Sequence, residues 1–136
     1  MASFTWKYHK LISSLFALMS VTACSGTLPE PVPLEERLAA RGYSIGEPVR
    51  RLQDYRINGW SNVDSRNVIL NVGASEHYLV TVRNNCEGLR SAERLAFSTI
   101  IGDLTDKDKL IVRGPGRFFE NCYIDTIRTL EKIKQD

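Results

Sequence analysis

Apolar and polar residues alternate along two neighbouring segments in the middle of the chain. Every second position is apolar, and the residues between are polar except for Ile69 and Leu79; the repeating apolar positions are Val68, Leu70, Val72, Tyr78, Val80 and Val82. A period of two places alternate side chains on opposite faces of a β-strand. Residues 73–76, with the sequence Gly-Ala-Ser-Glu, form a connection of turn length between the two segments. The pattern therefore predicts an antiparallel hairpin.

The same reasoning predicts further short strands, the last of which is ambiguous. They are expected near residues 55–61, 95–101, 110–113 and 122–130. In the last segment an isoleucine or leucine recurs every three residues from Ile124 to Ile133, a spacing that suits a helix. We therefore expect a strand first and helical turns toward the end of the chain.

Leu34 to Arg41 has the features of a short helix. Acidic residues occupy its first turn, arginine its last, and Gly42 follows directly. Leu34 and Leu38 share one face, which could rest on the rest of the domain. A helical turn is also expected within residues 87–93.

Short strands about ten residues apart, without alternating strands and helices, indicate a small antiparallel sheet. The predicted fold class is α+β, mostly β. We expect a small curled antiparallel sheet or partly open barrel with one or two short helices.

The N-terminal residues 1–23 have the order of a secretory signal. Lys7 and Lys10 precede an apolar stretch from Leu11 to Val21, which is too short to span a bilayer. The ending Ser-Val-Thr-Ala-Cys looks like the lipobox of bacterial lipoproteins, so we predict that Cys24 is lipidated. An ordinary signal peptidase could also cut before Cys24, and the apolar stretch could be a buried helix.

Residues 24–33 contain three prolines within five positions, at Pro29, Pro31 and Pro33. Proline fixes φ and lacks an N–H donor, so we expect an extended tether. An irregular loop packed on the domain is the alternative. Residues 34–136 then form a single β-rich domain.

The charge pattern argues against a nucleic-acid partner. No acidic residue precedes Glu30, and removing Lys7 and Lys10 from the 18 basic residues leaves 16, which equals the 16 acidic residues. Proteins that bind nucleic acid usually carry a basic excess on one face. We therefore expect no nucleic-acid partner.

Cys86 and Cys122 are the two cysteines that remain once Cys24 is acylated. In an oxidising compartment such a pair usually forms a disulfide. A metal or redox site is the alternative, but the chain has no Cys-x-x-Cys motif and His77 is the single histidine after residue 24. We predict a structural disulfide, no metal and no other cofactor.

His77 is the one imidazole that could act as a base in the mature chain. A serine hydrolase would need a nucleophile beside it, and residues 59–63, Gly-Trp-Ser-Asn-Val, do not form the Gly-x-Ser-x-Gly elbow. Because His77 lies next to a predicted turn, we expect it to be solvated rather than catalytic.

Two further motifs are better explained as turns. Asp103, Asp106 and Asp108 could suggest a calcium loop, but the glycine and glutamate of an EF-hand are missing. Residues 114–116, Gly-Pro-Gly, lack the lysine of a phosphate-binding loop. We expect a turn at each place.

Trp60, Phe118 and Phe119 could line a pocket. Aromatic residues at strand spacing more often belong to the core, and the core is the interpretation that we favour for all three. The pocket near Trp60, with His77, is kept as a possible ligand site.

Four short motifs occur in a familiar order. They are Ile57-x-x-Trp60, Tyr78-Leu79-Val80-x-Val82, Cys86-x-x-Leu89 and Cys122-x-Ile124-x-x-Ile127. This order, over about residues 49–130, resembles a family of small exported Gram-negative proteins of unknown function, many with lipoprotein signals. The resemblance implies an envelope domain whose two cysteines pair, with no established activity or cofactor.

The leading hypothesis is a non-enzymatic lipoprotein domain, a structural or interaction module on the periplasmic face of the outer membrane. Ser25 rather than Asp follows Cys24, which in lipoproteins favours outer-membrane sorting. The expected partners are the membrane, through the N-terminal lipid, and an unknown envelope protein. A filled barrel with an exposed apolar patch would favour this hypothesis. An aromatic pocket near Trp60 would favour a small-ligand-binding module, and a hydrolase is third.

Overall fold

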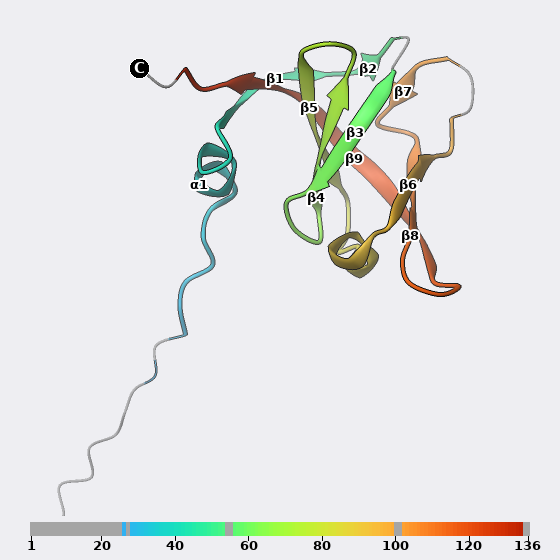
Figure 1. The fold of residues 1–136 in the computed structure, drawn as a ribbon, viewed down its shortest axis with the longest axis horizontal. Coiled ribbons are helices and arrows are strands. Elements are labelled where there is room, and N and C mark those ends of the chain that lie inside the picture. The colour runs from blue at the N-terminus through green and yellow to red at the C-terminus, as the bar shows by residue number, and fades with distance from the viewer. Residues whose placement is uncertain (1–25, 27, 54–55, 100–101, 135–136) are drawn as a thin grey trace, which may run out of the picture. The chain divides into compact units, whose positions relative to one another are not determined.

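The computed structural model describes residues 26, 28–53, 56–99 and 102–134 (Figure 1). The predicted signal, residues 1–23, and Cys24 lie outside the described residues, as does the predicted start of a strand at Tyr55. The chain divides into two units, Met1–Pro31 and Val32–Asp136. Residues 28–33 are exposed and have no regular secondary structure. The architecture that follows is that of the second unit.

Strands make up most of the second unit, with one short α-helix and one 3₁₀ turn. The elements are α1 (Leu34–Ala39), β1 (Tyr43–Val49), β2 (Arg51–Leu52), β3 (Ile57–Asn62), β4 (Asn67–Val72), β5 (Glu76–Val82), η1 (Glu87–Ser91), β6 (Arg94–Phe97), β7 (Leu104–Thr105), β8 (Lys109–Arg113) and β9 (Phe119–Lys132). The predicted fold class, mostly β with one or two short helices, is confirmed.

The main sheet is antiparallel, and its seven strands curl into a nearly closed barrel (Figure 1). The strand order is β3-β4-β5-β9-β8-β6, and β1 pairs with β9 as well. The long strand β9 makes this possible, because residues 119–123 pair with β8 and residues 127–132 pair with β1. Strands β2 and β7 form a separate small sheet. The predicted hairpin is confirmed as β4 and β5, in which Leu70 pairs with Tyr78.

The interior of the curled sheet is filled by apolar side chains. The buried members of this core are Leu52, Val68, Leu70, Val72, Val80, Val82, Cys86, Leu89, Leu104, Leu110, Val112, Cys122, Ile124 and Ile127. Burial of apolar area supplies most of the favourable free energy of folding. Every strand of the main sheet contributes to this core, either through these residues or through partly buried residues packed on them. Strand β1 contributes only its last residue, Val49. The barrel is therefore a packed body rather than an open cup.

A second, smaller core lies on the outer face of the sheet, under α1. Leu38 is fully buried there against Ile69, Leu79 and Leu130. This confirms the prediction that one face of the helix rests on the domain. The helix ends at Ala39, and Gly42 completes the turn that follows with φ of 83°, a conformation that glycine adopts without strain. The second core explains why β4 is buried on both faces.

Strand β9 differs from its prediction in two ways. Strand β9 continues to Lys132, so the helical turns expected near the end of the chain are wrong. A register shift lies between the pairs Thr81–Thr126 and Val82–Ile124, where the extra residue is Asp125. Because a bulge reverses the facing of later residues, Ile124 and Ile127 both point into the interior core.

Strand β1 was not predicted, because the apolar residues of Tyr43–Val49 are interrupted by Gly46 and Pro48. Its pairing with β9 has a shift between Ile45 and Pro48. Such an irregular edge strand has no clean period of two. Strand β6 ends at Phe97, earlier than predicted, and Ile100 and Ile101 lie outside the described residues.

Within the part of the chain that the structure describes, no helix is long and apolar enough to cross a membrane.

Candidate functional site

The turn between β8 and β9 exposes aromatic side chains. Residues 115–119, with the sequence Pro-Gly-Arg-Phe-Phe, are all exposed. The exposed fraction is 49% for Phe118 and 64% for Phe119, and Tyr123 on the same strand is 54% exposed. The prediction that Phe118 and Phe119 belong to the core is therefore wrong. Both lie at the end of the hairpin, beyond the point where the interior core can cover them.

A hollow of about 460 Å³ lies at this turn. It is lined by Ile111, Arg113, Gly114, Gly116, Arg117, Phe118, Phe119 and Asn121. Arg113 and Arg117 are exposed, and neither takes part in any of the ion pairs formed among the described residues. Aromatic rings and arginines side by side are the side chains that dominate binding surfaces. We call residues Arg113 to Phe119, together with Asn121 and Tyr123, the turn patch.

Two glycines hold the ring of Phe118 in place. A Cβ added at Gly88 would lie 2.7 Å from Phe118 Cε1, and one added at Gly114 would lie 3.2 Å from Phe118 Cδ1. The ring therefore packs against the backbone of η1 and of the turn itself. One side of the ring is supported while the other faces solvent. The residue at the apex, Gly116, has φ of 69°, which makes this tight turn accessible.

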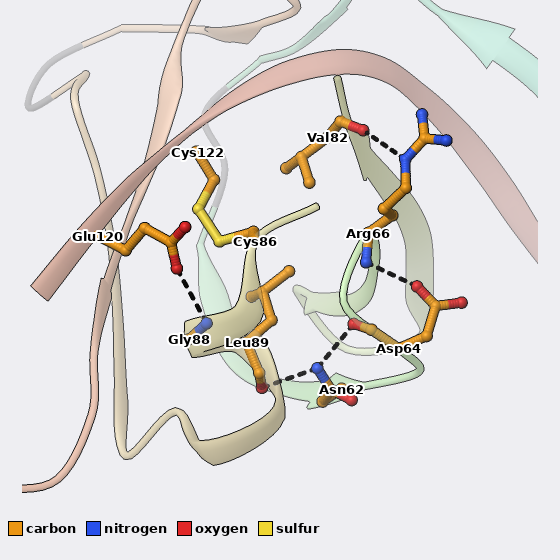
Figure 2. The surroundings of a disulfide bond; sticks show 9 residues. All are labelled: Asn62, Asp64, Arg66, Val82, Cys86, Gly88, Leu89, Glu120 and Cys122. Atoms are coloured by element: carbon orange, nitrogen blue, oxygen red, sulfur yellow. Dashed lines mark hydrogen bonds between the residues drawn. A yellow bond between two sulfur atoms is a disulfide. The ribbon is translucent and has the colours of Figure 1, made fainter. Parts of the chain in front are cut away.

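A disulfide between Cys86 and Cys122 lies behind the patch, with the two Cα atoms 6.0 Å apart (Figure 2). It joins the segment leading into η1 to strand β9, and both cysteines are buried in the interior core. Glu120 Oε2 accepts a hydrogen bond of 2.9 Å from the N–H of Gly88. The disulfide and this bond fix η1 against the start of β9, which is where Phe118 packs.

The far side of η1 is tied to strand β3. Asn62 Nδ2 donates to the carbonyl oxygen of Leu89 at 2.7 Å and to that of Asp64 at 2.9 Å (Figure 2). Arg66 Nε donates to the carbonyl oxygen of Val82 at 3.2 Å. These contacts link the β3–β4 connection to the end of β5 and to η1. The support of the turn patch is therefore a rigid layer rather than a loop.

Cys86, Glu120 and Cys122 are also close enough to hold a metal ion, with their ligand atoms within 4.8 Å of one another. Cysteine binds metals as a thiolate. In the disulfide neither sulfur is a thiolate, and Glu120 is already bonded to Gly88. The geometry is that of a structural cross-link.

His77 lies on the outer face of the sheet and is half-buried, so the expectation of a solvated ring is wrong. Its Nδ1 is 2.9 Å from Asn71 Oδ1, and its ring centroid is 5.0 Å from that of Tyr43. Tyr43 belongs to β1, the strand that the sequence pattern missed. Burial, together with the positive charge of Lys132, lowers the pKa of His77. The neutral ring has a packing role here.

Trp60 lies on the other face from His77. It is partly buried and packs against the interior core, as the core interpretation predicted. It pairs with Leu70, which pairs in turn with Tyr78. The structure therefore does not bring Trp60 and His77 together.

A second hollow, of about 420 Å³, opens near Tyr78. Its lining residues are Val49, Arg50, Arg51, Leu52, Gln53, Val72, Glu76 and Tyr78. Burial, followed by the nearby Glu76, raises the pKa of Tyr78, whose hydroxyl donates to Glu76 Oε2 at 3.3 Å. Neither Trp60 nor His77 lines this hollow.

The aspartates of residues 103–108 form a turn, as predicted. Asp108 Oδ2 accepts hydrogen bonds from the N–H and the hydroxyl of Thr105, at 2.8 and 2.9 Å. Burial alone would raise the pKa of Asp108, but the hydrogen bonds from Thr99, Thr105 and Ser98 outweigh it and lower the pKa. Asp103 instead pairs with Arg51 at 3.3 Å. The carboxylates do not converge on one point.

The turn patch was not found from the sequence, although one signal was available. Residues 109–119 contain three basic residues, Lys109, Arg113 and Arg117, and no acidic one. Because the residues after position 23 carry equal numbers of basic and acidic side chains, that local excess beside two phenylalanines marks a surface. Assigning the phenylalanines to the core concealed it.

The fold and the site define a small, disulfide-bonded antiparallel β-protein with an exposed aromatic and basic turn. A family model described as "Family of unknown function (DUF6491)" matches residues 7–136, and the chain belongs to this family. The resemblance to a family of unknown function is thereby confirmed. No curated protein and no solved structure gives a significant match to the chain.

Proposed function

We propose that the protein is a lipid-anchored envelope protein whose β-rich unit is a non-enzymatic interaction module. The observation that carries this proposal is the contrast between a filled interior and an exposed aromatic turn. Large apolar side chains on a surface cost solvation free energy unless a partner covers them. Phe118 and Phe119 therefore favour binding at the turn patch over chemistry inside the barrel.

The surroundings of the titratable groups support a non-enzymatic role. His77 bonds to Asn71, Asp108 organises its own turn, and Glu120 binds the backbone of Gly88. A catalytic site needs an acid, a base or a nucleophile aimed at one reacting atom. Each of these three groups instead serves a structural contact in a different part of the fold.

The anchor is the second part of the proposal. The apolar stretch from Leu11 to Val21 and the ending at Cys24 support acylation of that cysteine. Ser25 supports sorting to the periplasmic face of the outer membrane. Exposed residues 28–33 suit a spacer between the lipid and the β-rich unit. An envelope protein of unknown identity could then bind the presented unit.

The anchor is tested by intact-mass analysis of the protein from membrane fractions. The expected mature chain begins at Cys24 and carries the mass of a diacylglyceryl group with its fatty acids. Cys24→Ser should abolish the adduct and release the chain or leave it unprocessed. Ser25→Asp is the matched control, since it should keep the adduct and change only the membrane. A wild-type mature chain without lipid contradicts the anchor.

A small-ligand-binding module using a pocket near Trp60 is the alternative. It has less support, because Trp60 packs on the filled core and does not line the hollow beside Tyr78. Trp60→Phe should therefore leave the partners of the protein unchanged.

A further inference from the structure

We propose that the turn patch is a second membrane contact, which inserts Phe118 and Phe119 at the interface of an anionic phospholipid bilayer. The inference rests on the proposed function, because it uses the lipid anchor at Cys24 to hold the chain near the bilayer. It names the bilayer as the partner of the turn patch. The lipid on Cys24 would hold the chain at the membrane. The turn patch would fix which face of the β-rich unit meets the bilayer.

The side chains of the patch suit the bilayer interface. Aromatic residues partition to the boundary between head groups and acyl chains, and arginines beside them attract anionic lipids. Phe119 is 64% exposed and Phe118 is 49% exposed, at the end of a hairpin and at the edge of the hollow. A protruding turn can enter an interface without distorting the sheet behind it.

The charge of this region complements an anionic surface. Residues 109–119 contain three basic side chains and no acidic one, so their net charge is +3. The register of the sheet adds one cation, because Arg94 on β6 pairs with Arg113 on β8, and one exposed acidic residue, Glu93, whose N–H donates to the carbonyl oxygen of Arg113 at 2.8 Å; the excess stays at three positive charges. The next acidic residue, Glu120, directs its carboxylate inward to Gly88.

A cation–aromatic contact lies on the part of the patch that follows β9. The Lys109 ammonium lies 5.6 Å from the centroid of the Tyr123 ring, so a cation and an aromatic ring are held together on the exposed face. Asn121 lies between Tyr123 and Phe119 on the same strand and lines the hollow. The hollow beside Arg113 and Arg117 has room for a phosphate-bearing head group.

The length of the tether makes the bilayer the partner at the highest local concentration. The ten residues from Cys24 to Pro33 span at most about 36 Å when extended. A tether of that length converts a weak surface contact into an intramolecular one.

A bilayer is favoured over a nucleic acid because the charges of the mature chain balance and the excess is confined to one turn. It is favoured over a protein partner because both phenylalanines protrude at the turn with cations around them. Capture of a protein alone at this position is therefore an outcome that would overturn the proposal.

The test measures insertion of the turn in reconstituted vesicles. The mature full chain, with Phe119→Trp, is placed in vesicles of phosphatidylcholine alone or mixed with phosphatidylglycerol, each with brominated acyl chains that quench tryptophan. Trp60 is the background fluorophore, and it packs against the core. Ala74→Trp, in the exposed turn between β4 and β5, is the matched control.

The expected result is strong quenching of the Trp at position 119 in anionic vesicles, weaker quenching in neutral ones, and none at position 74. Each basic residue near an anionic surface contributes roughly fivefold to binding. Arg113→Glu with Arg117→Glu should therefore weaken the inserted state at least tenfold. Arg56→Glu with Lys134→Glu changes the net charge equally outside the patch and should leave quenching unchanged. Equal quenching at both positions, or in both kinds of vesicle, would overturn the proposal.

The intact mass of the same sample keeps the two proposals apart. If Cys24 carries no lipid, the anchor proposal fails. Quenching of the Trp at position 119 by added anionic vesicles still tests the turn patch. If Cys24 is lipidated but position 119 is not quenched, the patch fails and the anchor stands.

Discussion

Two hairpins of the same sheet differ in what their turns expose. The β4–β5 hairpin turns at Gly73, Ala74 and Ser75, which are small and exposed, and its strands are buried on both faces. The β8–β9 hairpin turns through Arg117 and Phe118, and Phe119 follows at the start of β9. Both turns join antiparallel strands, so the turn itself does not require aromatic residues.

The comparison separates residues needed for folding from residues available for binding. At the first hairpin the apolar side chains all point into one of the two cores, so their burial stabilises the fold. At the second, two of the largest apolar side chains are left in solvent while their neighbours are fixed by a disulfide. A rigid support beneath an exposed aromatic turn is the arrangement expected of a binding surface.

The largest expected effect contrasts one residue from each hairpin. Leu70 is fully buried in β4, and Leu70→Ala should lower the free energy of unfolding by about 2–5 kcal/mol because it leaves a cavity. Phe119→Ala should change it by less than about 0.5 kcal/mol, as is usual for exposed sites. Urea titration of the two variants measures both. A large loss for Phe119→Ala would mean that this ring serves the fold.

The next effect concerns the support of the turn patch. Cys86→Ser with Cys122→Ser should lower the free energy of unfolding by about 2–4 kcal/mol, since the disulfide closes a long loop in the unfolded chain. Urea titration of the double variant gives the value, and reduced wild-type protein is the control. If the wild-type thiols react freely without reductant in the folded protein, the disulfide assignment is contradicted.

A smaller effect should follow from Gly88→Ala. The new methyl group would lie 2.7 Å from Phe118 Cε1, so the ring must move outward. We expect a stability loss of about 1 kcal/mol, at the low end for added volume, because the ring faces solvent on its other side. Hydrogen exchange of the turn amides should rise. Gly59→Ala, in β3, is the control for loss of a glycine, because neither Gly88 nor Gly59 has a positive φ and the new methyl group at position 59 would meet Asn71 Nδ2 only at an ordinary contact distance of 3.5 Å.

The smallest effect is a dependence of stability on pH through His77. Its pKa is lowered in the folded state, so the unfolded chain binds a proton first as the pH falls. The contribution of His77 is therefore present above its unfolded pKa of about 6.5 and is lost as the pH falls below it. His77→Gln should flatten the stability profile between about pH 7 and 5.5. An unchanged profile would show that burial and Lys132 do not lower the pKa of His77.

The strands with a regular period of two could be predicted from the sequence. The β4–β5 hairpin was found because every second residue from Val68 to Val72 and from Tyr78 to Val82 is apolar, and β8 because it is a short apolar run that follows a turn. The C-terminal part of β9 was predicted wrongly because of the bulge at Asp125. One extra residue there turns a period of two into a spacing of three. A pattern of residue types carries no mark of a bulge, which is decided by the partner strand.

For a related reason, only part of the candidate site could be predicted from the sequence. The cysteine pair could be predicted from redox chemistry, because it requires no knowledge of which strands are neighbours. The burial of His77 depends on β1, whose residues are far from it in the sequence. The exposure of Phe118 and Phe119 depends on where the core ends, and no local pattern encodes that.

The central claim is that the β8–β9 turn, and not the β4–β5 turn, is the surface at which the protein meets the membrane. The most direct test places the photo-crosslinking residue benzoylphenylalanine at Phe119 or at Ala74 in the full chain in living cells. Intact-mass analysis after irradiation then identifies what each position has captured. The account predicts phospholipid adducts at position 119 and none at position 74. Equal phospholipid yields at the two positions, or protein adducts alone at position 119, would contradict it.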